Sequence, residues 1–153
     1  MSRCPDSKTM KNTFISTTLL VVLFGSCNRA VDPADPLYRT WQHTTTTYPD
    51  GRIITITNAA NYDIVTFRPN GTILYGANGR YAACCFPHRF KRKGNTLDFT
   101  KVTSIPIPEV DNAGQCHLVD CVGPGASWQI LSTADKQLVI ETHFGIATYQ
   151  TYQ

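Results

Sequence analysis

Tyr62-Asp-Ile-Val-Thr-Phe-Arg-Pro-Asn-Gly-Thr-Ile-Leu-Tyr75 is the stretch that decides the fold of this chain. Its first six residues favour a β-strand, because β-branched and aromatic side chains fit a pleated surface. They place Tyr62, Ile64 and Thr66 on one face and Val65 and Phe67 on the other. Residues 68–71 are a tight-turn signal, and residues 72–75 supply the returning strand. The stretch therefore predicts an antiparallel β-hairpin.

The same alternation of short strands and turns continues on both sides of this hairpin. Turn signals occur at residues 49–51 and 94–95, and no ten-residue stretch shows helical periodicity. Eight to ten short strands joined by hairpins predict an all-β fold, either an antiparallel up-and-down β-barrel of about eight strands or a β-sandwich. Further strands are expected at residues 38–48, 52–57, 80–86, 88–93, 96–99, 127–132, 137–142 and 146–152.

An export signal precedes this β-rich part. Lys11 is followed by an apolar run over residues 14–24, then by Gly25, Ser26 and Cys27. A basic residue, an apolar run of about 7–15 residues and a small-residue cleavage site form a secretory signal. The run is shorter than the roughly 20 residues that span a bilayer. We expect residues 1–26 to be a signal peptide, residues 27–36 to be a tether that begins with Cys27, and residues 37–153 to form one β-barrel domain.

Residues 23–27, Leu-Phe-Gly-Ser-Cys, resemble the lipobox of bacterial lipoproteins, in which the cysteine carries the lipid. The resemblance implies that a lipid on Cys27 anchors the protein in the bacterial cell envelope, at the outer membrane or the periplasmic face. The membrane is then its first expected partner. The alternative is plain secretion, with Cys27 an ordinary thiol.

The charge of the exported part gives no reason to expect a nucleic-acid partner. The whole chain of 153 residues carries a formal +3. Residues 1–26 contain three basic residues and one acidic residue, so the remainder has 11 basic and 10 acidic residues, a formal +1. No strong field remains to attract a polyanion.

Four segments carry a wider resemblance: Leu37-Tyr-Arg-Thr-Trp41, Val65-Thr-Phe-Arg-Pro-Asn-Gly-Thr72, Gly94-Asn-Thr-Leu97 and Trp128-Gln-Ile-Leu-Ser-Thr-Ala-Asp-Lys-Gln-Leu-Val139. In this order and spacing they resemble the small lipocalin-like lipoproteins common in Bacteroidetes. Lipocalins typically have Gly-x-Trp at the first strand, where this chain has Arg39-Thr-Trp41. The resemblance implies a compact, exported, lipid-anchored β-barrel, usually without an assigned activity.

Four cysteines fall in the expected domain, and an even number in an exported protein indicates disulfides. Neighbouring cysteines on a strand point to opposite faces, so the adjacent pair is expected to bond to the other two rather than to each other. The alternative is zinc, but the spacings are unlike those of zinc sites and the compartment is oxidising. We expect no metal. The four are Cys84, Cys85, Cys116 and Cys121.

A basic cluster surrounds Phe90 in the segment Arg89-Phe-Lys-Arg-Lys93. It would suit contact with anionic lipid head groups. The alternative, which we favour, is a solvated strand edge, because lysines at an edge prevent unwanted pairing between sheets.

Aromatic residues on the expected strands offer a binding hypothesis. A small barrel either fills its interior with side chains or holds one small ligand. One reading is that Trp41, Phe67, Tyr75 and Trp128 hold a small apolar ligand in a cavity of a few hundred cubic ångströms, with Tyr62 and Phe144 as further candidates. The alternative is a packed, ligand-free barrel that acts as a structural or interaction protein of the envelope, meeting its partner through the long segment 100–126 or the outer face.

No motif supports an enzyme. Ser104, Ser127, Asp135 and His143 can be combined on paper into a hydrolase triad, but the chain lacks both G-x-S-x-G and H-E-x-x-H. We expect no catalytic residues and no cofactor.

Overall fold

The hairpin between residues 62 and 75 forms in the computed structural model, which describes residues 32–99, 108–112, 116, 120, 123 and 125–153. β3 (Ile64–Phe67) and β4 (Ile73–Tyr75) pair antiparallel, with Val65 opposite Tyr75. The side-chain oxygen of Asn70 accepts the Thr72 N–H at 3.0 Å. Gly71 has φ +81°, a conformation that glycine adopts without steric penalty. The turn chemistry therefore confirms the predicted hairpin.

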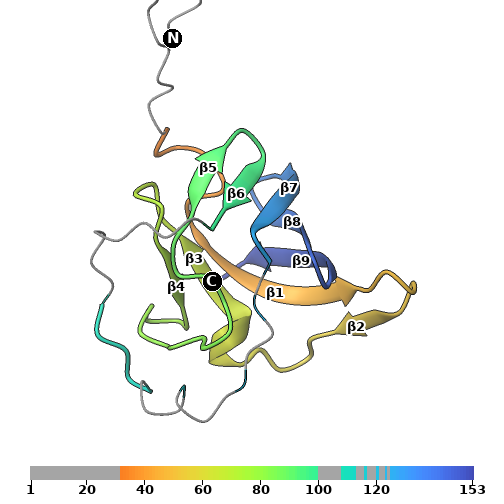
Figure 1. The fold of residues 1–153 in the computed structure, drawn as a ribbon, viewed down its shortest axis with the longest axis horizontal. Helices are drawn as coiled ribbons and strands as arrows, with labels where there is room; N and C mark the ends of the chain where they lie inside the picture. Colours follow the sequence, from red (N-terminus) through yellow and green to blue (C-terminus); the bar gives the residue numbers. More distant parts are fainter. Residues whose placement is uncertain (1–31, 100–107, 113–115, 117–119, 121–122, 124) are drawn as a thin grey trace, which may run out of the picture. The chain divides into compact units, whose positions relative to one another are not determined.

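The strands of the described residues form one antiparallel sheet. Its order along the main path is β4-β3-β1-β9-β8-β7-β6-β5, and β2 pairs with the far half of β1. The sheet curls through 256° into a half-barrel, and Figure 1 shows the strong curvature of its strands. The predicted up-and-down architecture of about eight strands is thus confirmed. The remaining strands are β1 (Thr40–Thr47), β2 (Ile53–Thr55), β5 (Lys91–Lys93), β6 (Thr96–Asp98), β7 (Ser127–Thr133), β8 (Gln137–Thr142) and β9 (Gly145–Thr151).

The two edges of the curled sheet meet at one point. Thr72, just before β4, forms an isolated antiparallel bridge with Arg89, just before β5. The Ile73 N–H donates to the His88 carbonyl oxygen and the Phe90 N–H donates to the Gly71 carbonyl oxygen, both at 2.8 Å. These bonds join the first and last strands of the path.

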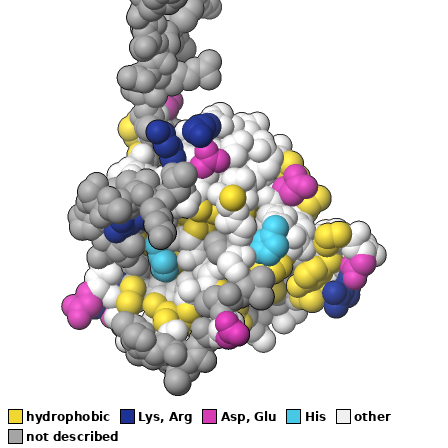
Figure 2. All heavy atoms as spheres, in the orientation of Figure 1, with side chains coloured by type: hydrophobic (Ala, Val, Ile, Leu, Met, Phe, Trp, Pro, Cys, Tyr) yellow, Lys and Arg dark blue, Asp and Glu magenta, His cyan; other side chains and the backbone are white. Residues whose placement is uncertain are grey.

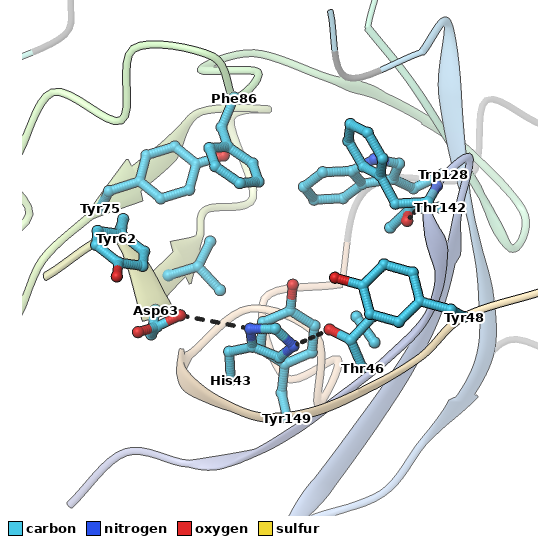
Figure 3. A pocket seen from close by; sticks show the side chains of 13 residues that line it. His43, Thr46, Tyr48, Tyr62, Asp63, Tyr75, Phe86, Trp128, Thr142 and Tyr149 are labelled. Atoms are coloured by element: carbon cyan, nitrogen blue, oxygen red, sulfur yellow. Dashed lines mark hydrogen bonds and ion pairs between the residues drawn. The ribbon is translucent and has the colours of Figure 1, made fainter. Parts of the chain in front are cut away.

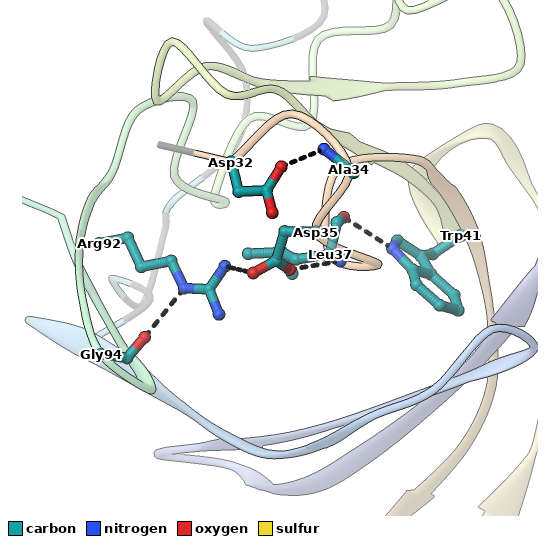
Figure 4. Close-up of polar contacts among 7 residues, drawn as sticks. All are labelled: Asp32, Ala34, Asp35, Leu37, Trp41, Arg92 and Gly94. Carbon is teal, nitrogen blue, oxygen red and sulfur yellow. Dashed lines mark hydrogen bonds and ion pairs between the residues drawn. The ribbon is translucent and has the colours of Figure 1, made fainter. Parts of the chain in front are cut away.

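We call the end of the sheet where β1 begins the closed end, because a chain segment fills it. Leu37 is fully buried there, and its carbonyl oxygen accepts the indole N–H of Trp41 at 3.0 Å. Asp35 caps the Leu37 N–H at 2.9 Å and pairs with Arg92 at 2.6 Å. Figure 4 shows residues 32–37 held inside the curl of the sheet by these contacts. Residues 32–36 belong to the expected tether, and here they lie against the barrel.

The predicted strand at residues 80–86 is wrong. Tyr81 makes a single bridge to Tyr75, and the chain then turns, with the Phe86 N–H donating to the Ala83 carbonyl oxygen. The side chain of Asn112 takes the place of a neighbouring strand. It accepts the Ala82 N–H at 2.6 Å and donates to the Ala82 carbonyl oxygen at 3.2 Å. The backbone is therefore satisfied without a sheet partner, a contact that local sequence does not reveal.

Several expectations fall on residues that the structure does not describe. The signal peptide, Cys27, Ser104, Cys121 and most of the segment 100–126 lie outside the described residues. Within the part that is described, no helix has the length and apolar character needed to cross a membrane.

Candidate functional site

A cavity of about 250 Å³ lies inside the sheet at the end opposite Leu37, which we call the open end. Figure 3 shows its lining side chains converging on an empty centre. They come from the last residues of β1, the first residues of β7 and β9, the end of β4 and the turns beside them. The lining consists of His43, Thr46, Tyr48, Tyr62, Asp63, Val65, Tyr75, Phe86, Trp128, Thr142, Phe144, Ala147 and Tyr149.

A β-bulge in β1 decides which of its side chains enter the cavity. The pairing with β9 shifts register between His43 and Thr45. Before the bulge the inward positions are odd-numbered, Trp41 and His43. After it they are even-numbered, Thr46 and Tyr48. An extra residue in one strand has this effect because strand side chains alternate with a period of two. The bulge therefore adds a hydroxyl and a phenol to the cavity wall.

The floor of the cavity is polar. His43 Nδ1 lies 3.5 Å from Asp63 Oδ1, and the other ring nitrogen lies 2.9 Å from the Thr46 hydroxyl and 3.0 Å from the Thr45 carbonyl oxygen. Asp63 is 6% exposed, and its second carboxylate oxygen accepts the Ala60 N–H at 2.9 Å. A short 3₁₀ helix (Asn61–Asp63) turns this carboxylate inward. The floor is thus a hydrogen-bonded cluster held by backbone contacts.

Burial changes the acidity of the two inner phenols. Burial raises the pKa of Tyr149 well above its ordinary value, and the negative charge of Asp63 raises it further. Burial raises the pKa of Tyr75 in the same way, with a smaller contribution from Tyr149. The Tyr75 hydroxyl donates to the Pro87 carbonyl oxygen at 2.8 Å. Both phenols therefore stay neutral hydrogen-bonding groups at physiological pH.

The structure divides the four expected ligand-binding residues between two places. Tyr75 and Trp128 line the cavity. Trp41 is fully buried at the closed end, and Phe67 packs edge-on against Phe90 with ring centroids 5.8 Å apart. The other two aromatic candidates, Tyr62 and Phe144, do line the cavity. Contact of any of these with a ligand stays a prediction.

Sequence reasoning missed the polar floor. His43 lies in a threonine-rich strand, and Asp63 falls where a strand was expected to begin. Residues 61–63 form a 3₁₀ helix instead, which leaves Tyr62 53% exposed and buries Asp63. The only local signal was an aspartate three residues after Ala60, a spacing at which a carboxylate can bond back to the backbone.

The structure confirms that the described cysteines form disulfides. Cys84 and Cys116 form a disulfide across 32 residues. Cys85 is also disulfide-bonded, and Cys121 lies outside the described residues. The adjacent cysteines thus do not bond to each other. Oxidised sulfurs are not thiolate ligands, and the described residues contain no group of three or more His, Cys, Asp or Glu placed to hold a metal ion.

The basic cluster at residues 89–93 is divided among acidic partners. Arg92 pairs with Asp35 at 2.6 Å, and Lys93 pairs with Asp98 at 2.7 Å. Figure 2 shows basic and acidic side chains side by side at the β5–β6 end of this face. These ion pairs reduce the net positive charge of the cluster. The structure therefore favours the interpretation as a solvated strand edge over a site for anionic lipids.

The residues proposed on paper as a hydrolase triad are not brought together. Asp135 lies in the turn before β8 and His143 in the turn after it. The six-residue strand separates them by about 20 Å.

Comparisons with protein-family models, with curated proteins and with solved structures found no match. They therefore do not identify the chain as a lipocalin-like lipoprotein. The assignment of a half-barrel depends on the strand topology alone. A function has to be inferred from the cavity.

Proposed function

We propose that this chain is an exported, lipid-anchored protein of the lipocalin-like kind that binds a small apolar ligand at the open end of its barrel. The observation that carries this function is the cavity of about 250 Å³ inside a sheet whose other inward side chains form a buried core. Protein interiors are close-packed, and ligand sites are typically concave, mostly apolar and supplied with a few polar groups. The volume is near the lower end for such sites, so the ligand is small.

The cavity wall suits an apolar molecule. Trp128 and Tyr75 are 4% and 2% exposed, and Val65 and Ala147 contribute further buried surface. The ring of Phe99 packs edge-on against the indole of Trp128, with ring centroids 4.9 Å apart. The wall is therefore held in place before a ligand arrives, which lowers the entropy lost on binding.

The position of the cavity fits a lipid anchor. The described chain enters the barrel at the closed end, where Leu37 is buried. A lipid on Cys27 would be joined to that end, and the cavity opens at the other. Such a protein could hold its ligand while attached to a membrane. Plain secretion would leave the same cavity on a soluble protein.

The alternative is a structural or interaction protein of the envelope with a solid barrel. The closed end is packed in that way, but the open end contains the cavity. The observation thus favours ligand binding over the alternative.

Native mass spectrometry of the protein extracted from its own envelope tests this function. Ala147 is 6% exposed and lines the cavity, so Ala147→Phe places a phenyl ring in it. Ala134→Phe is the matched control, because Ala134 is exposed in the turn before β8 at the closed end.

We expect wild type and Ala134→Phe to carry a lipid on Cys27 and a retained small molecule, and Ala147→Phe to keep the lipid and lose the molecule. Circular dichroism would show that both variants are folded. A chain without lipid would contradict the anchor. A molecule retained equally by Ala147→Phe, or by none of the three proteins, would contradict binding in the cavity.

A further inference from the structure

The charge of the cavity lining is one-sided. Asp63 is the only carboxylate among the 13 lining residues, and none of them is lysine or arginine. The lining also contains one imidazole, that of His43. Arg52 lies nearby, with its guanidinium over the Tyr48 ring at 4.7 Å. It is paired with Asp50 at 3.5 Å and is 63% exposed, so solvent screens its charge.

The carboxylate of Asp63 is held in place but only weakly compensated. Its side chain is 7% exposed, one oxygen accepts a backbone N–H, and the other lies 3.5 Å from His43. That last distance is longer than a charge-assisted hydrogen bond of ordinary length. A buried carboxylate is costly unless it is paired and hydrogen-bonded. A cation in the cavity would supply a closer partner than His43.

Aromatic rings form much of the same cavity lining. Seven of the 13 lining residues are tyrosine, phenylalanine or tryptophan. Three of these, Tyr62, Phe86 and Phe144, are 53%, 41% and 43% exposed, an unusual exposure for large rings. The faces of aromatic rings attract cations and stack on apolar groups. Figure 3 shows Tyr62 near Asp63, and Phe86 beside Tyr75 on the same side of the cavity.

The same lining is electrostatically unfavourable for an anionic ligand. The negative charge of Asp63 adds to the effect of burial in raising the pKa of the Tyr149 phenol. A carboxylate or phosphate beside the same groups would be repelled, and no lysine or arginine in the lining would offset the repulsion.

Building on the proposed ligand binding, on which this step rests, we propose that the cavity selects a small organic cation, an amine carried on an aromatic or compact apolar body. The ammonium group pairs with the carboxylate of Asp63 at the floor, where the Tyr149 and Thr46 hydroxyls can accept its remaining hydrogens. The apolar body lies against Tyr75 and Trp128, and the exposed rings at the mouth close over it.

Three ligands of one shape test this selectivity. Phenethylamine, 2-phenylethanol and phenylacetate differ mainly in the terminal group, which is cationic, neutral or anionic at neutral pH. Isothermal titration calorimetry on the purified full-length protein would measure each affinity. We expect phenethylamine to bind about tenfold tighter than 2-phenylethanol, because a hydrogen bond to a charged group is the stronger kind, and phenylacetate to bind most weakly.

Two variants assign the effect to one carboxylate. Asp63→Asn removes the charge and keeps an oxygen that can accept the Ala60 N–H. We expect it to lower the affinity for phenethylamine to within about threefold of that for 2-phenylethanol. Asp135→Asn is the matched control, because Asp135 lies at the closed end with its side chain 90% exposed. It should leave all three affinities unchanged.

The outcomes separate the ligand class from the binding function. Binding of phenylacetate or 2-phenylethanol as tight as that of phenethylamine would overturn the cationic selectivity and leave ligand binding intact. So would an unchanged preference in folded Asp63→Asn. If that variant does not fold, the comparison of the three ligands in wild type still decides. Failure of all three ligands to bind would overturn both the selectivity and the binding function.

Discussion

Gly145 is the position at which a single methyl group should do most damage to the open end. It begins β9 with φ +141°, a conformation that side chains other than glycine rarely adopt. A Cβ placed there would overlap the Thr47 carbonyl oxygen and lie 3.1 Å from Thr47 C and from Tyr48 Cα. These are backbone atoms of the neighbouring strand, so no rotamer change relieves the overlap.

The magnitude follows from separating two contributions. A residue forced into a positive-φ conformation costs about 1–2 kcal/mol. The clash with β1 adds to this, since backbone must move in a packed sheet, and we expect Gly145→Ala to lose about 3–4 kcal/mol in total. Gly51→Ala is the matched control, because Gly51 has φ +83° and open space around its Cβ position. It should lose only about 1 kcal/mol.

Urea denaturation followed by tryptophan fluorescence would give both free energies of unfolding. The expected gap between the two variants is about 2–3 kcal/mol, which is the contribution of the clash alone. Equal losses for Gly145→Ala and Gly51→Ala would refute the close approach of β9 to β1 beside the cavity. Equal losses would also contradict the placement of Tyr48 in the cavity lining.

Three further perturbations test other parts of the structure. Arg92→Ala should lower the free energy of unfolding by about 1–2 kcal/mol, because it leaves the half-buried Asp35 without its partner at 2.6 Å; an unchanged urea midpoint would contradict this. Replacing both Cys84 and Cys116 by alanine should lower it by about 3–4 kcal/mol, the chain-entropy value for a loop of 32 residues; a loss below about 1 kcal/mol would argue against that account. The raised pKa of Tyr149 means that the unfolded chain loses this proton first as pH rises, so stability should fall above about pH 10. Tyr149→Phe should show a smaller fall between pH 9 and 11, and a fall equal to that of wild type would refute the assignment.

Turn chemistry made much of this fold predictable. The Pro-Asn-Gly turn at residues 69–71 and the Gly-Asn turn at residues 94–95 each connect paired strands. The strand expected at residues 137–142 has the bounds of β8. These features depend on local backbone preferences, which a sequence displays directly.

The site was less predictable because it depends on non-local contacts. The bulge after His43 changes which threonines face inward, and the threonine run gives no sign of it. The Asn112 side chain, far along the chain, replaces a strand beside Ala82. Trp41 and Trp128 look alike in sequence, yet only Trp128 reaches the cavity. The difference arises because residues 32–37 fill the closed end, where they bury Trp41, and leave the end at Trp128 open.

The two tryptophans provide the most direct test of ligand binding at the open end. The chain contains two, Trp41 hydrogen-bonded to the Leu37 carbonyl at the closed end and Trp128 in the cavity wall. Their indole N–H signals can be followed by ¹H–¹⁵N correlation spectroscopy during titration with phenethylamine and 2-phenylethanol, and assigned with Trp128→Phe. Binding in the cavity predicts that the Trp128 signal shifts to saturation while the Trp41 signal stays in place. Equal shifts of both signals, or no shift of either at millimolar ligand, would contradict it.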